Sequence, residues 1–177
     1  MTTSIFVTKK LEAVIKCNVL PNNINNTSFL GKWNATVFYL DRRKCLLFSN
    51  GTTKYNVIVA DFKVKDLKKI GFLFTDAFHQ QLNFDGIPIS LNCIQSIIGE
   101  LEFHPTDNDR STISFQNQRI GDVNVYKSEY AEFEMMPIQI FCNRMNINPI
   151  SIGTSKTKYT NSIAEMKKLL TSGNFII

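Results

Sequence analysis

Two polar clusters contain the residue types of this chain that are best suited to binding an anion. Their members are Arg42, Arg43 and Lys44 in the first cluster, and Asn108, Asp109, Arg110 and Ser111 in the second. Arginine binds carboxylate and phosphate oxygens in pairs, and amide and hydroxyl groups add hydrogen bonds to the same anion. If the clusters converge on one surface, they predict a non-enzymatic binding or regulatory protein whose partner is a nucleic acid or an acidic protein.

A catalytic alternative depends on His104, which precedes the second cluster. His104 could act as a general base, with Asp109 orienting its ring. Arg42 or Arg110 could then stabilise an anionic transition state. The predicted reaction is metal-independent hydrolysis of phosphodiester bonds in nucleic acid. Because the sequence identifies no second acid, the question of catalysis stays open and the binding interpretation is preferred.

A third interpretation gives the same charges a structural role only. Asp41 and Asp109 could each pair with an arginine of the other cluster and so join the two segments. Asp109 also precedes a predicted helix, where a carboxylate interacts favourably with the positive end of the helix dipole. In that case neither cluster forms a binding surface.

Composition argues against several other kinds of site. The chain has two histidines and four cysteines, and no two cysteines have the Cys-x-x-Cys spacing of a zinc site. The eight glycines are scattered and form no phosphate-binding loop. We therefore expect no metal, no cofactor and buried, reduced thiols.

Size and charge favour one soluble domain over residues 1–177. The 44% hydrophobic content is sufficient for a core, and the net charge of +5 is compatible with an acidic partner. No secretion signal and no apolar run of membrane-spanning length is present. These features predict a cytoplasmic protein that does not bind membranes, and they leave its oligomeric state open.

The first cluster lies within a predicted antiparallel sheet. Strand-like runs occur at residues 35–40, 45–50 and 55–60, and Asn50-Gly51 is a frequent hairpin turn. Residues 3–7 and 136–141 are predicted as further strands. The sheet is expected to be antiparallel or mixed, with the first cluster at a turn between two of its strands.

Helices are predicted to cover one face of this sheet. Apolar spacings of three and four indicate helices over roughly 63–83, 87–101 and 106–126. Thr8 can cap a short first helix, and Ser162 can begin a last helix that reaches Leu170. Together these elements predict the α+β class.

Several landmarks in a consistent order resemble an uncharacterised bacterial domain family of unknown function. They are Thr8-Lys9-Lys10-Leu11, Leu30-Gly31-Lys32-Trp33, the run from Asp41 to Asn50, Asp66-Leu67 and the run from Thr106 to Ser111. The resemblance implies a small bacterial cytoplasmic domain, and we expect the protein to be bacterial or carried by a mobile element. It implies no activity, cofactor or binding residue.

Overall fold

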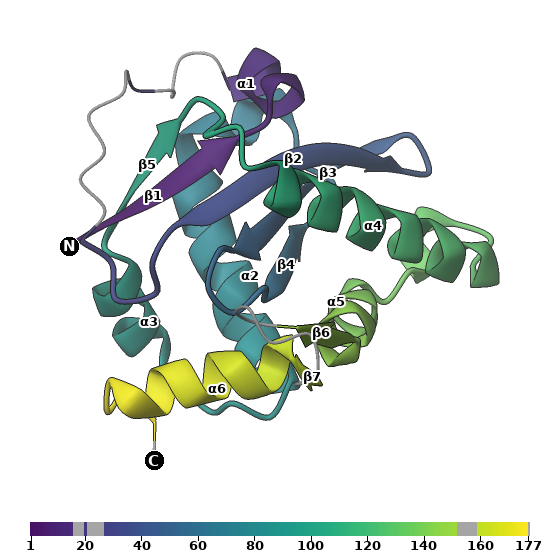
Figure 1. The fold of residues 1–177 in the computed structure, drawn as a ribbon. Coiled ribbons are helices and arrows are strands. Elements are labelled where there is room, and N and C mark those ends of the chain that lie inside the picture. Colours follow the sequence, from purple (N-terminus) through teal and green to yellow (C-terminus); the bar gives the residue numbers. More distant parts are fainter. Residues whose placement is uncertain (16–19, 21–26, 152–158, 177) are drawn as a thin grey trace.

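The computed structural model describes residues 1–15, 20, 27–151 and 159–176. Its main element is a five-stranded sheet with the order β4-β3-β2-β1-β5 (Figure 1). The strands are β1 (Thr2–Val7), β2 (Trp33–Leu40), β3 (Arg43–Asn50), β4 (Asn56–Val59) and β5 (Glu100–His104). A separate pair, β6 (Pro149–Ser151) and β7 (Tyr159–Asn161), forms a small antiparallel ladder.

The sheet is mixed. β2, β3 and β4 form an antiparallel meander, which confirms the three strands predicted between residues 35 and 60. β1 runs parallel to both β2 and β5. The chain therefore leaves β1, builds the meander on one side of it and returns much later to add β5 on the other.

Helices cover both faces of the sheet, so the expectation of one covered face was wrong. One apolar cluster joins the sheet to α1 (Lys9–Ile15), α2 (Ile70–Phe84), α3 (Leu91–Ile98) and α6 (Ser162–Ser172). The other joins it to α4 (Arg110–Tyr126) and α5 (Ile138–Ile147). Figure 1 shows α2 and α4 on opposite sides of the sheet. The remaining short helices are η2 (Val64–Lys69), η3 (Lys127–Glu129) and η4 (Phe133–Met135).

The sequence of the meander explains why both faces are covered. Val37 and Phe38 are neighbours in β2, yet they belong to different apolar clusters, as do Leu46 and Leu47 of β3. Successive residues of a strand point to opposite faces, so a run that is apolar at every position has two faces to bury.

One other predicted element was wrong in type, and one predicted helix was confirmed but ends earlier than expected. The predicted strand at 136–141 is the start of α5, with Pro137 at its N-cap position. The predicted helix over 87–101 ends at Ile98, and the residues that follow Gly99 form β5. Gly99 has a φ of +63°, a conformation that suits glycine and ends the helix. Pairing with β1 then decides the conformation of residues 100–104.

The turn between β2 and β3 has only two residues, Asp41 and Arg42. Leu40 pairs with Arg43 across it, and both turn residues have positive φ, 44° and 63°. This is the conformation of the hairpin turn whose twist matches that of the strands. The predicted hairpin at Asn50-Gly51 is also present, but its loop is longer and reaches Tyr55.

Candidate functional site

The two polar clusters lie at opposite ends of β2. At its start, Asp107 accepts hydrogen bonds from Lys32 Nζ (2.6 Å) and Asn34 Nδ2 (3.3 Å), which holds the loop of the second cluster there. Arg42 follows the other end of β2, beyond Leu40. At roughly 3.3 Å per strand residue, the segment from Asn34 to Leu40 spans about 20 Å. The structure therefore keeps Arg42 apart from Asp107, although Asn108 lines a groove along the second half of β2.

Asp109 has a structural role as the N-cap of α4. Its carboxylate accepts hydrogen bonds from the Thr112 backbone N–H (3.1 Å) and from the Thr112 hydroxyl (2.9 Å). Lys32 Nζ lies 3.6 Å from the same carboxylate. The Thr112 hydrogen bonds, together with Lys32 and Lys54, lower the pKa of Asp109. Its ion-pair partner is thus Lys32, and not an arginine of the first cluster.

Within the first cluster, Arg43 is engaged by its own neighbours. Its guanidinium group pairs with Asp61 (Nη1–Oδ2 3.2 Å) and with Glu134, and it lies over the Phe133 ring at 5.1 Å. Arg42 is exposed at the turn. The cluster therefore supplies one exposed guanidinium group rather than two.

The predicted general base is inaccessible. The His104 side chain is fully buried, and it packs against the Phe6 ring with the centroids 5.6 Å apart. Its closest carboxylate is that of Glu102, with Nε2 and Oε2 3.6 Å apart. Neither ring nitrogen has a hydrogen-bond partner within the described part of the chain. This geometry gives no support to general-base catalysis by His104 with Asp109.

A groove beside β2 brings together a different set of residues. Its volume is about 660 Å³, and it lies between α1, the second half of β2 and α4 with the loop before it. Its apolar lining comes from Val14, Val37, Ile113 and Ile120. Lys9, Lys10, Asn108, Asn117 and the half-exposed Tyr39 form its rim. Asn108 is the one residue of the second polar cluster that lines it.

The groove exists because β1 and β2 pair with an offset, so the second half of β2 extends beyond the end of β1. The two strands pair only as far as Val7 and Ala35. Thr8 N then donates to the Ala35 carbonyl (3.0 Å), and the chain turns into α1 at Lys9. β2 continues with β3 beyond the end of β1, as Figure 1 shows. This second half of β2 has α1 towards one face of the sheet and α4 towards the other.

The charge at the groove is positive. Lys9 and Lys10 are exposed on its rim, and neither forms an ion pair with any residue that the structure describes. Lys44 of the first cluster pairs across the strands with Tyr39, so it adds a third cation at the turn end. Lys32 neutralises Asp107 beyond the start of the groove. An acidic ligand would thus meet unpaired lysines here.

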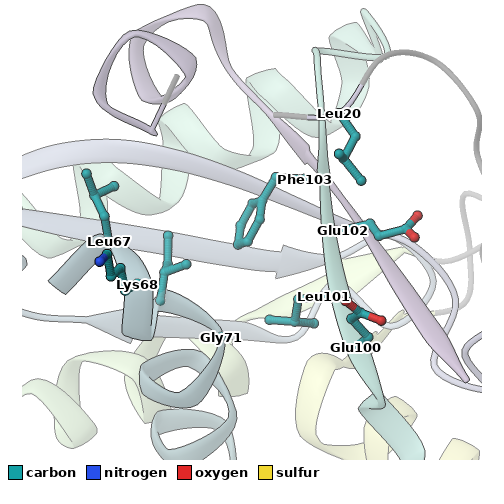
Figure 2. A pocket seen from close by; sticks show the side chains of 9 residues that line it. Leu20, Leu67, Lys68, Gly71, Glu100, Leu101, Glu102 and Phe103 are labelled. Carbon is teal, nitrogen blue, oxygen red and sulfur yellow. The ribbon is translucent and has the colours of Figure 1, made fainter. Parts of the chain in front are cut away.

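A second, smaller cavity of about 490 Å³ lies along the outer edge of β5 (Figure 2). Four residues of β5 line it, and the side chains of Leu101 and Phe103 extend to one side of the strand and those of Glu100 and Glu102 to the other (Figure 2). Leu20 also lines it, and residues 16–19 and 21–26 on either side of Leu20 are outside the described part. We therefore place the candidate site in the larger groove.

Two of the three described thiols are buried and poorly suited to react. Cys45 and Cys142 are buried and unpaired with each other, and burial raises the pKa of both, that of Cys142 to about 12. Cys93 is half-buried, and Cys17 lies outside the described residues. No group of three or more potential metal ligands occurs among the described side chains. Among the same residues, no helix combines the length and apolar character needed to cross a bilayer.

Comparison with known families gives one match. The profile of a family described as a domain of unknown function, DUF6933, matches residues 4–165. The chain belongs to this family. No curated protein and no solved structure matches it significantly. The DUF6933 match spans β1 to the first part of α6, and so it includes the whole groove.

The sequence analysis missed Lys9, Lys10 and the edge of β2 as parts of a site. From sequence, Thr8-Lys9-Lys10 is only a landmark of the resemblance to a family. The runs at 3–7 and 35–40 are nearly equal in length, so their lengths do not indicate the groove; it follows from the offset that pairs Val7 with Ala35. That pairing joins residues about thirty positions apart and leaves no local pattern.

Proposed function

We propose that this DUF6933 protein is a non-enzymatic binding protein that holds an acidic segment of a protein partner in the groove beside β2. The observation that carries the proposal is the combination of an apolar lining with the unpaired lysines Lys9 and Lys10 on the rim. Apolar contacts supply most of the affinity of such sites, and complementary charge selects the partner.

An acidic protein suits this groove better than a nucleic acid. Nucleic-acid sites combine many backbone phosphate contacts with exposed aromatic rings on which bases stack. The groove has two rim lysines and a single exposed ring, that of Tyr39. The lysines of η2, Lys65, Lys68 and Lys69, do not line it.

A peptide-display selection tests the proposal. The immobilised protein is presented with a library of random peptides about ten residues long, a typical upper length for one strand. We expect enrichment of sequences that contain both acidic and apolar residues. Replacing both rim lysines, Lys9→Glu with Lys10→Glu, should weaken binding of the enriched peptides about tenfold. The matched control is Lys167→Glu with Lys168→Glu on exposed positions of α6, and it should leave binding unchanged.

Several results would overturn this function. Enrichment of peptides that lack acidic residues would show that the groove is not the binding site. An equal loss of binding in the two charge-reversal variants would show the same. Binding of single-stranded DNA or RNA of about 16 nucleotides, with a steep loss on adding salt, would show a nucleic acid to be the partner instead.

A further inference from the structure

We propose that the acidic segment binds as an additional β-strand, paired with the free edge of β2 at Val37 and Tyr39. This inference depends on the proposed function, because it states how the same groove holds its partner. It assigns the main recognition to backbone groups of β2 and predicts a specific pattern of side chains in the ligand.

The backbone of β2 offers four unpaired groups in the groove. Leu40 and Arg43 close a two-residue turn, so alternate residues from Leu40 backwards bond to β3. Ala35, Val37 and Tyr39 have the opposite orientation, and the Ala35 carbonyl indeed accepts from Thr8 N on the β1 side. The N–H and C=O groups of Val37 and Tyr39 therefore point away from β3. Within the described part of the chain, they have no hydrogen-bond partner.

This edge has the properties of a strand acceptor. Unpaired N–H and C=O groups along a strand are a template for another strand, and several protein domains bind peptides in this way. Val37 is only 9% exposed, so its polar backbone groups lie in a recess rather than on an open surface. A peptide strand would satisfy these groups and fill the groove at once.

The two walls of the groove predict the side-chain pattern of the added strand. Side chains of a strand alternate between the two faces of its sheet. On one face, the groove is bounded by α1 with Lys9 and Lys10, and on the other by α4 with Ile113 and Ile120. The ligand should therefore alternate acidic residues, facing α1, with apolar residues, facing α4.

The same charges argue against a second copy of this chain as the occupant. Pairing of two identical β2 edges would bring both sets of Lys9 and Lys10 together, and lysines beside an edge strand are a common protection against such self-association. The lysines thus disfavour pairing of this edge with a second copy of the chain and favour pairing with an acidic strand.

Backbone N-methylation of the ligand provides a test that leaves the protein untouched. The probe is a fluorescein-labelled peptide of alternating valine and glutamate, about eight residues long. In a bound strand, either the valines or the glutamates, but not both, have their N–H groups directed at β2. We expect N-methylation of the residues whose N–H groups face β2 to weaken binding by about tenfold or more. N-methylation of the other residues should have little effect.

A pair of protein variants tests the receptor side. Tyr39→Pro removes the side chain and the edge N–H, whereas Tyr39→Ala removes the same side chain and keeps the N–H. Proline is tolerated on an edge strand where its nitrogen faces outward, so the sheet should persist. We expect Tyr39→Pro to bind the peptide about tenfold more weakly than Tyr39→Ala. A melting curve of each variant establishes that both are folded.

The outcomes separate this inference from the function on which it depends. If the peptide binds and is sensitive to Lys9→Glu with Lys10→Glu, but both methylated versions behave alike, strand addition is wrong and the binding function stands. If neither this peptide nor any acidic library peptide binds, the function itself is wrong. A concentration-dependent dimer that the peptide dissociates would make a second copy the natural occupant and overturn the inference.

Discussion

At the scale of single residues, Asp85 joins three parts of the fold. Its carboxylate accepts hydrogen bonds from the Tyr55 hydroxyl (2.5 Å), Gln81 Nε2 (2.9 Å), Asn143 Nδ2 (2.8 Å) and Asn146 Nδ2 (3.4 Å). These donors come from α2, α5 and the residue before β4. Burial and the Asp85 carboxylate raise the pKa of Tyr55 well above its usual value, so this residue stays a donor. No spacing in the sequence indicates this convergence.

Replacing Asp85 should be costly for stability. Asp85→Ala leaves four polar groups without their acceptor, and we expect the free energy of unfolding to fall by about 3 kcal/mol. Urea denaturation measures the change. The matched control is Asp76→Ala within α2, whose carboxylate accepts one exposed hydrogen bond from Gln80. That variant should lose less than about 0.5 kcal/mol, and similar losses in both would show that Asp85 is not special.

The N-cap of α4 should make stability depend on pH. Asp109→Ala removes the two hydrogen bonds from Thr112 and should cost about 1 kcal/mol at neutral pH. Because folding lowers the pKa of Asp109, its contribution is present above the unfolded value of 3.8 and is lost as pH falls through the folded value. The stability difference between wild type and variant, measured by urea denaturation, should therefore shrink below about pH 4. A difference that grows on acidification would contradict this role.

At the scale of elements, the sequence predicts those whose pattern is local. The meander follows from its apolar runs, α4 from Asp109 before it, and α6 from the polar residues that precede it. The N-cap of α6 is Asn161, however, and not Ser162. The sequence fails where distant pairing decides the structure. Residues 100–104 continue a helical spacing of apolar residues, but they become β5 because β1 offers them a partner. The predicted strand at residue 136 fails because α5 packs its apolar face on the sheet instead of joining it.

Gly99 should be the critical residue between α3 and β5. A Cβ at this position would overlap the Met1 carbonyl, so Gly99→Ala should displace β1 from β5 and cost well over 1 kcal/mol. Gly86 is the control, because it has a similar positive φ of +75° but no atom within 4 Å of a Cβ. Gly86→Ala should cost only the conformational term of about 1 kcal/mol. Melting temperatures compare the two, and equal effects would show that the contact with Met1 is unimportant.

At the scale of the whole molecule, the sequence predicts the class but not the place where function is proposed. The α+β class follows from composition and runs, and the mixed sheet agrees with it. The candidate site depends on the register of β1 against β2 and on which helix lies on which face. Of the residues chosen from sequence, Asn108 lines the groove and Lys44 lies beside it, whereas Arg43 and Asp109 are held by neighbours. The sequence alone does not show which lysines and arginines form ion pairs in the fold and which stay unpaired.

The position of β1 between β2 and β5 also sets an order in time. During synthesis β1 and β2 leave the ribosome early, whereas β5 follows almost a hundred residues after β1. At typical translation rates that interval is roughly 5–20 s. During this interval, the edge of β1 that will pair with β5 has no strand partner. An unpaired strand edge of this kind is a template for wrong pairing, so late arrival of β5 should make the incomplete chain prone to aggregation.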